Sequence, residues 1–142
     1  MMFKRRTSRG FGLFDGVIAL AILAFGLLAL SRFGTRLTAN ANEAQQRMLA
    51  SALSDELLNT MLIDSGNAAC YTLPPAGACA SAAATARATE WQTRALASLP
   101  GATSAATALN AATNQMAVTL TWTGKASTDT HSHQVISDVR SN

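Results

Sequence analysis

An uncharged run near the N terminus constrains this chain more than any other feature. It extends from Gly16 to Ser31 and has the sequence GVIALAILAFGLLALS. Counted from Phe11, the apolar stretch has 21 residues and a single charged residue, Asp15. A helix of that length spans the hydrocarbon core of a bilayer, which is about 30 Å thick. The remainder of the chain must therefore fold as a part attached to a membrane-type segment.

A basic leader precedes the apolar stretch. Residues 1–10 contain four of the eleven Lys and Arg residues, which leaves seven basic against eight acidic residues in the rest of the chain. The net charge of +3 therefore describes the leader and predicts no nucleic-acid surface. Arg32 and Arg36 flank the far side, but four basic residues against two favour a cytoplasmic leader. The C-terminal part would then be periplasmic or extracellular.

The helical pattern continues beyond the apolar stretch. No proline occurs before Pro74, and Ala, Leu, Gln, Glu and Arg are good helix formers. We predict one helix from Phe11 to Ile63, about 80 Å long at 1.5 Å per residue. Apolar residues in its second half recur at spacings near three and four, which predicts a face for a domain to pack on. The residues predicted for this face are Leu37, Ala41, Ala44, Met48, Ala52, Leu58, Met61 and Leu62.

The C-terminal half predicts a small sheet. Apolar residues alternate with Ala and Thr over residues 115–123, which indicates a strand. Residues 133–139 are predicted to pair with it as an antiparallel hairpin, and residues 86–98 to form a short helix. We expect residues 102–113, rich in Ala and Thr, to be an irregular connection that could include a short strand. The predicted fold class is α+β, with a small antiparallel sheet packed on the second half of a long N-terminal helix.

Two cysteines, Cys70 and Cys79, lie in a loop predicted over residues 68–80, which follows turn residues at 64–67. Their spacing fits neither a CxxC redox motif nor a zinc knuckle. In an exported protein, an oxidising compartment favours a disulfide between them. By chain entropy, a loop of this size would contribute roughly 2–3 kcal/mol of stability. The alternative is two buried free thiols.

A few polar residues have competing interpretations. His131 and His133 could hold a metal with a third ligand, but two exposed loop histidines are the favoured interpretation. Asp55 and Glu56 form a solvated pair on the helix or meet basic residues of a neighbouring subunit. The sequence contains no G-x-S-x-G, H-E-x-x-H, P-loop or Rossmann glycine motif. We therefore predict a chain that is not an enzyme and has no cofactor or metal.

The N-terminal segment allows three interpretations. It could be a secretory signal peptide with an A-x-A cleavage site at residues 39–41, or a plain single-span anchor. The apolar run is long for a signal peptide, and a plain anchor gives Asp15 no purpose, although an acid in a bilayer is costly. In the third interpretation the leader is cut after Gly10. The new amine of Phe11 then lies one helical turn from Asp15, which could neutralise that amine or the amine of an adjacent subunit.

The third interpretation coincides with a family resemblance. The sequence RGFGLFD from Arg9 to Asp15, followed by an apolar run, resembles the class III signal of type IV pilins and type II secretion pseudopilins. The resemblance implies that a prepilin peptidase cleaves after Gly10 and methylates Phe11. It also implies that Asp15 takes the position of the family's glutamate, which is one methylene longer. Subunits of this family assemble into a filament through their N-terminal helices.

Later segments resemble one branch of that family, the PilV-type minor pilins of type IV pili. The segments are ALAILAFGLLALSRF, QRMLASALSDELLNTM, residues 90–101 and the strand ending VTLTWT. This resemblance favours a minor pilin over the similar secretion pseudopilins. An unrelated secreted or anchored protein is the more distant alternative.

The resemblance implies a domain organisation and a life cycle. We expect a leader at residues 1–10, a transmembrane and filament-core helix segment at 11–31, an amphipathic continuation at 32–64 and a small globular head at 65–142. The chain would first lie in the inner membrane with its N terminus in the cytoplasm, and then in an extracellular pilus. Its partners would be the prepilin peptidase and other minor and major pilins. With them it would help to initiate assembly and would sit at or near the filament tip.

Overall fold

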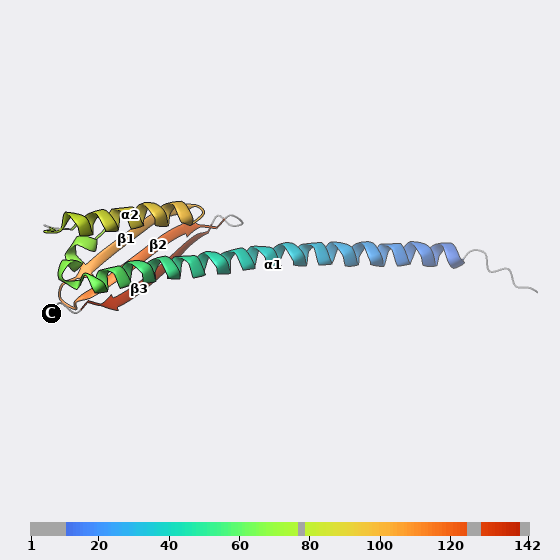
Figure 1. Ribbon diagram of the computed structural model, residues 1–142. Coiled ribbons are helices and arrows are strands. Elements are labelled where there is room, and N and C mark those ends of the chain that lie inside the picture. Colours follow the sequence, from blue (N-terminus) through green and yellow to red (C-terminus); the bar gives the residue numbers. More distant parts are fainter. Residues whose placement is uncertain (1–10, 77–78, 125–128, 140–142) are drawn as a thin grey trace, which may run out of the picture. The chain divides into compact units, whose positions relative to one another are not determined.

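The computed structural model describes residues 11–76, 79–124 and 129–139, and it has the predicted α+β fold (Figure 1). Residues 1–10, which include the predicted leader and Gly10, lie outside the described residues. Contacts divide the chain into an N-terminal unit, Met1–Ala41, and a C-terminal unit, Asn42–Asn142. The elements in chain order are α1 (Phe11–Ile63), the 3-10 helix η1 (Ser65–Tyr71), α2 (Ala82–Ser98), β1 (Ala102–Asn110), β2 (Gln115–Thr123) and β3 (Thr130–Asp138).

Helix α1 has the predicted bounds, Phe11 and Ile63. The hydroxyl groups of Ser31 and Thr38 donate hydrogen bonds of 3.0 Å to backbone carbonyls one turn earlier. These side chains are thereby satisfied on the helix itself and do not compete with its backbone bonds. By length and composition, α1 is able to cross a membrane.

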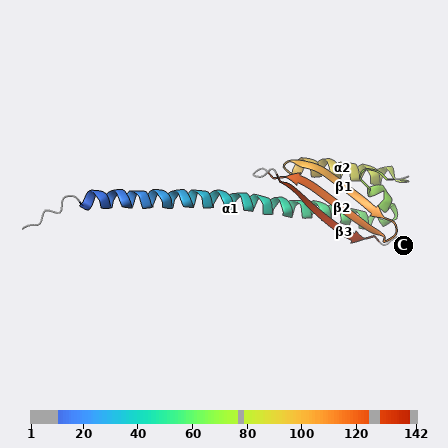
Figure 2. The same ribbon diagram turned by 180° about the vertical axis from the view of Figure 1, so that it is seen from behind.

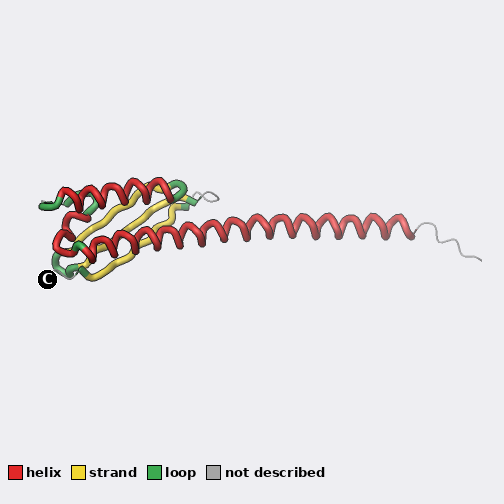
Figure 3. Tube along the Cα trace, in the orientation of Figure 1, coloured by secondary structure: helices red, strands yellow, loops and turns green. Residues whose placement is uncertain are grey.

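The three strands form one antiparallel sheet in the order β1-β2-β3 (Figure 3). Strand β2 has the predicted bounds, residues 115–123. Strand β1 corrects the prediction, because most of residues 102–113 form a regular nine-residue strand. Alanine, which is depleted in strands, supplies four of these nine residues and weakens the strand signal in isolation. Here the pairing with β2 and the burial of Ala105 and Thr107 supply the stabilisation that the local sequence does not.

Two elements begin earlier than predicted. Strand β3 begins at Thr130 rather than His133, because its pairing with β2 continues to the end of that strand. Helix α2 begins at Ala82 rather than Ala86. The side chain of Ser81 accepts a hydrogen bond of 3.3 Å from a backbone amide of the first turn and caps the helix there.

In the C-terminal unit, α2 and the second half of α1 lie on the same face of the sheet (Figures 1 and 2). The indole N–H of Trp91 donates to the carbonyl oxygen of Leu53 at 2.8 Å. The indole N–H of Trp122 donates to Oε1 of Gln46 at 3.0 Å. Both tryptophans are at most 2% exposed, so each bond satisfies a donor that would otherwise be buried without a partner. Together they fix which side of α1 lies toward the core.

The packing face of α1 differs from the predicted one. Leu58 and Met61 are buried as predicted. The other six predicted residues are exposed: Leu37, Ala41, Ala44, Met48, Ala52 and Leu62. The spacing of apolar residues did not distinguish the buried face of α1 from its exposed face, because alanine occurs on both. The predicted residues also do not keep to one side of the helix along its length. The residues that α1 buries are Gln46, Ala50, Leu53, Ser54, Leu57, Leu58 and Met61.

A tight turn connects α2 to β1 at Gly101, whose φ is +67°. Its carbonyl oxygen accepts a hydrogen bond of 2.9 Å from the amide of Thr123, at the end of β2. A Cβ at this position would lie 2.7 Å from the carbonyl oxygen of Thr123 and closer still to its hydroxyl group. Both the backbone conformation and the available space therefore require glycine.

We expect Gly101→Ala to lower the melting temperature of the full chain in detergent micelles, followed by near-ultraviolet circular dichroism. The left-handed conformation alone costs a side chain about 1–2 kcal/mol, which corresponds to a fall of several degrees. Gly66→Ala is the matched control, because a Cβ at Gly66 would have no atom within 4 Å. Equal melting temperatures for the two variants would contradict the role of Gly101.

Candidate functional site

The N-terminal unit exposes an apolar surface around the whole circumference of α1. Every residue from Gly12 to Thr38 is exposed. Large apolar side chains on this surface include Leu13, Phe14 and Phe25, which are 73–78% exposed. Proteins that are stable in water rarely expose a contiguous apolar surface of this extent. The segment therefore requires an apolar environment, which a bilayer or the helices of other subunits can supply.

Asp15 is the one charged residue of this surface between Gly12 and Ser31. Its carboxylate makes no hydrogen bond or ion pair with another residue in the described part of the chain. Phe11 begins α1 one turn earlier, and residues four apart on a helix are neighbours. An amine created at Phe11 would therefore lie close to the Asp15 carboxylate.

A second apolar surface lies on the C-terminal unit, on the side of α1 away from the core. Met48, Leu62 and Ile63 are 66%, 44% and 90% exposed. Ala44 and Ala52 belong to the same exposed side. We call these five residues the outer stripe. This stripe is the set that the sequence pattern had in part assigned to the core, and the structure leaves it free for another molecule.

The inner side of α1 meets β3 through polar side chains. Glu43 binds Arg47 at 2.6 Å, and Nδ1 of His131 lies 3.7 Å from the same carboxylate oxygen. The rings of Trp122 and His131 lie 5.8 Å apart. His131 and His133 are half-buried residues of a strand, which corrects the interpretation as exposed loop histidines. The described residues contain no cluster of three or more His, Cys, Asp or Glu side chains suited to a metal.

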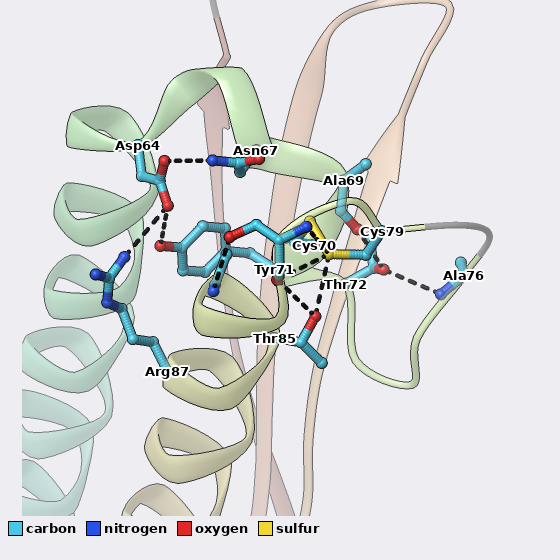
Figure 4. The surroundings of a disulfide bond; sticks show 12 residues. Asp64, Asn67, Ala69, Cys70, Tyr71, Thr72, Ala76, Cys79, Thr85 and Arg87 are labelled. Atoms are coloured by element: carbon cyan, nitrogen blue, oxygen red, sulfur yellow. Dashed lines mark hydrogen bonds and ion pairs between the residues drawn. A yellow bond between two sulfur atoms is a disulfide. The ribbon is translucent and has the colours of Figure 1, made fainter.

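Cys70 and Cys79 form a disulfide in the C-terminal unit (Figure 4). The segment predicted as a loop is more regular than expected, because η1 extends to Tyr71 and ends beside the bridge. Within the loop that the bridge closes, Leu73 exchanges backbone hydrogen bonds of 3.1 and 2.9 Å with Thr107. The disulfide thus holds a segment that adds an isolated bridge to the outer edge of β1.

A polar cluster next to the disulfide joins α1, η1 and α2 (Figure 4). The carboxylate of Asp64 accepts hydrogen bonds from Asn67 at 2.7 Å, Tyr71 at 3.0 Å and Arg87 at 3.3 Å. The bonds from Asn67 and Tyr71, with the charge of Arg87, hold the pKa of Asp64 below its ordinary value. Burial raises the pKa of Tyr71. These groups satisfy one another within the chain and tie the elements together.

Glu56 has an internal partner that the sequence did not reveal. Arg94 of α2 donates to both of its carboxylate oxygens, at 2.7 and 3.3 Å. Neither interpretation of Glu56 from the sequence, as a solvated residue or as a contact to a neighbouring subunit, had included this partner within the chain. Asp55, on the exposed side of α1, has no ion pair with any other described residue.

Several of the contacts that shape these surfaces join residues far apart in the sequence. Gln46 and Trp122 are 76 residues apart, and Glu56 and Arg94 are 38 apart. No local motif marks such pairs. For Asp64, the sequence showed only that it lies in a turn at the end of a helix. It did not show the three side chains that donate hydrogen bonds to its carboxylate.

Comparisons with known proteins give no further assignment. No family model, no curated protein and no solved structure matches the chain. Any functional inference therefore depends on the N-terminal motif and on the surfaces described above.

We expect Asp64→Asn to change how the stability of the protein depends on pH. A carboxyl group with a lowered folded pKa stabilises the protein above its unfolded pKa of about 3.9, and this contribution is lost as the pH falls through the folded pKa. The advantage of the wild type over Asp64→Asn should therefore be constant above about pH 5 and shrink below about pH 4. Denaturant unfolding from pH 7 to acid measures it.

Asp55→Asn is the matched control, because it removes a carboxylate of α1 that has no described ion-pair partner. Its unfolding curves should parallel those of the wild type. If Asp64→Asn also parallels the wild type at every pH, the Asp64 cluster does not stabilise the charged carboxylate.

Proposed function

We propose that this chain is a minor pilin of the PilV type, a non-catalytic structural subunit of a type IV pilus. The observation that carries the proposal is the fully exposed apolar circumference of α1 with one acid, Asp15, five residues after Gly10. The small α+β unit that follows on the same helix is the fold expected for a pilin head. The resemblance of the N-terminal sequence to class III signals agrees with it.

The apolar surface around α1 suits two successive environments, the membrane and the filament. Before assembly, the segment from Phe11 to Ser31 crosses the inner membrane, with the leader in the cytoplasm. During assembly, the same surface leaves the lipid and packs on the N-terminal helices of other minor and major pilins. Both environments remove apolar surface from water, so exchange between them costs little hydrophobic free energy.

Apolar packing between N-terminal helices does not fix their axial offset, and we assign this role to Asp15. Cleavage after Gly10 by the prepilin peptidase creates a cationic amine at Phe11, which the same enzyme methylates. In an apolar surrounding, the unpaired amine and the unpaired carboxylate are each unfavourable. Pairing Asp15 with the amine of its own chain or of an adjacent subunit removes both penalties, so helices assemble at the offset that allows it.

The outer stripe extends the surface available to other subunits into the C-terminal unit. Met48 and Leu62 lie on the side of α1 that the sheet does not cover. As a minor subunit at or near the filament tip, the chain would use this side for its contacts with other pilins. The chain acts by association, and the peptidase performs the covalent chemistry.

A pseudopilin of a type II secretion system is the second candidate, because the same helix and the same processing would serve that machine. The two are separated by the genes beside this one. Other minor pilins would support the pilus, and a secretion ATPase with a secretin would support the secretion system.

We expect the mature protein purified from its own host to begin at Phe11, with a methylated amine. Intact-mass and N-terminal peptide measurements identify both features. Gly10→Val should leave the leader in place, because the peptidase requires the small residue at the cleavage site in the family that this motif resembles. A mature N terminus at Asn42, or an uncut leader in the wild type, would contradict the proposal.

We expect Asp15→Ala to leave membrane insertion and leader cleavage intact and to reduce incorporation into sheared filaments several-fold, as measured by immunoblot. Asp15→Glu should retain incorporation, because it keeps the charge. Glu90→Ala is the matched control, since it removes an exposed acid of α2 rather than of α1. Unchanged incorporation of Asp15→Ala would remove the role assigned to this residue.

A further inference from the structure

Two arginines follow the apolar segment directly. Arg32 and Arg36 lie four residues apart, so their side chains share one side of α1. Both residues are exposed, and neither has an ion pair with another described residue. The hydroxyl group of Thr35, between them, donates to the carbonyl oxygen of Arg32 at 2.9 Å. The two guanidinium groups therefore keep all of their hydrogen-bond donors for a partner outside the chain.

The position of the pair along the helix matches one layer of a bilayer. At 1.5 Å per residue, Ser31 lies about 30 Å from Phe11, Arg32 about 32 Å and Arg36 about 38 Å. The hydrocarbon core is about 30 Å thick, and each headgroup layer adds about 5–7 Å. When Phe11 lies at one boundary of the core, Arg32 lies in the headgroup layer on the opposite side. Arg36 lies at the outer edge of that layer, from which its long side chain reaches back to the headgroups.

We infer that Arg32 and Arg36 form a binding surface for anionic phospholipid headgroups on the side of the membrane away from the leader. This inference depends on the membrane-inserted state proposed above, but not on the filament. A guanidinium presents a planar fork of donors that matches phosphate geometry. Two of them one turn apart can hold the phosphate groups of adjacent lipids and oppose movement of the helix into the membrane.

Within the described residues of the N-terminal unit, 11–41, Asp15 is the one acidic residue. Asp15 lies about 26 Å away along the helix, near the other boundary. The next acidic residue after the arginines is Glu43, and it already binds Arg47 at 2.6 Å. Lipid phosphate is present at the required depth before any other subunit arrives. The pair becomes more important once the leader is removed, because its four basic residues no longer hold the helix from the cytoplasmic side.

The test uses the full chain in nanodiscs that contain equal amounts of phosphatidylglycerol and phosphatidylcholine. The described residues contain no free cysteine, so Ala29→Cys, three residues before Arg32, gives one site for a bimane fluorophore. Nitroxide on the acyl chain of either lipid quenches bimane only at short range. When both arginines are present, labelled phosphatidylglycerol should quench the fluorophore more strongly than labelled phosphatidylcholine does. The reason is that Arg32 and Arg36 enrich the anionic lipid around this part of the helix.

The preference should fall about fivefold for Arg32→Gln or Arg36→Gln and disappear in the double variant, since a basic residue near an anionic surface contributes about this factor in binding. Arg47→Gln is the matched control, because it removes one exposed positive charge 11 residues after Arg36 in the sequence. It should leave the preference unchanged. Excess inorganic phosphate should also leave it unchanged, because the site binds lipid rather than free anion.

Five outcomes overturn the inference. Equal quenching by the two lipids in the wild-type background shows that no enrichment exists, and an equal loss in Arg47→Gln shows a general charge effect. Loss of the preference with inorganic phosphate identifies a free-anion site. An unchanged preference in the double variant, combined with weaker co-purification of differently tagged copies, identifies a protein partner instead. A chain that does not enter nanodiscs removes the inference and the membrane stage of the proposed function together, whereas an unprocessed N terminus in the host removes the pilin function alone.

Discussion

The apolar circumference of α1 is the constraint on which the rest of this protein depends. From Gly12 to Thr38 no side of the helix is covered, so the chain reaches a stable state only when something else removes this surface from water. The positions of the charged groups along this helix then become important. In the membrane-inserted state proposed above, Asp15 would lie near one boundary of a bilayer, and Arg32 and Arg36 near the other. Apolar contact would then supply most of the free energy, and these few charges would determine depth and register.

The C-terminal unit depends on two indole hydrogen bonds. Trp91 reaches the backbone of Leu53, and Trp122 reaches the side chain of Gln46. Because a buried indole donor without a partner is costly, these bonds select one rotation of α1 against the sheet. That choice places Met48 and its neighbours outside. The same contacts that build the core therefore also determine which side of the helix remains available for assembly.

The sequence predicted those parts of the fold whose signals are local. The long helix and β2 have strong periodicity and no interruption, so their bounds were correct. Strand β1 was missed because Ala and Thr are ambivalent residues whose conformation is set by the neighbouring strand. The packing face of α1 was partly wrong for a related reason, since Gln46 is buried only because Trp122 lies opposite it, 76 residues later. At the candidate site, Asp15 was recognisable as an acid in an apolar run, whereas the internal pairing of Glu56 with Arg94 required the tertiary structure.

The pairing of Leu73 with Thr107 links the redox state of the compartment to the sheet. Unpaired strand edges are templates for association between chains, and here the segment beside the outer edge of β1 is tied to α2 by the Cys70–Cys79 bridge. A reducing compartment such as the cytoplasm does not favour the bridge, and without it the edge lacks this covalent support. If the C-terminal unit is exported as proposed above, oxidation closes the loop only after translocation. The sheet edge would then mature at the moment when the proposed partner subunits are about to be met.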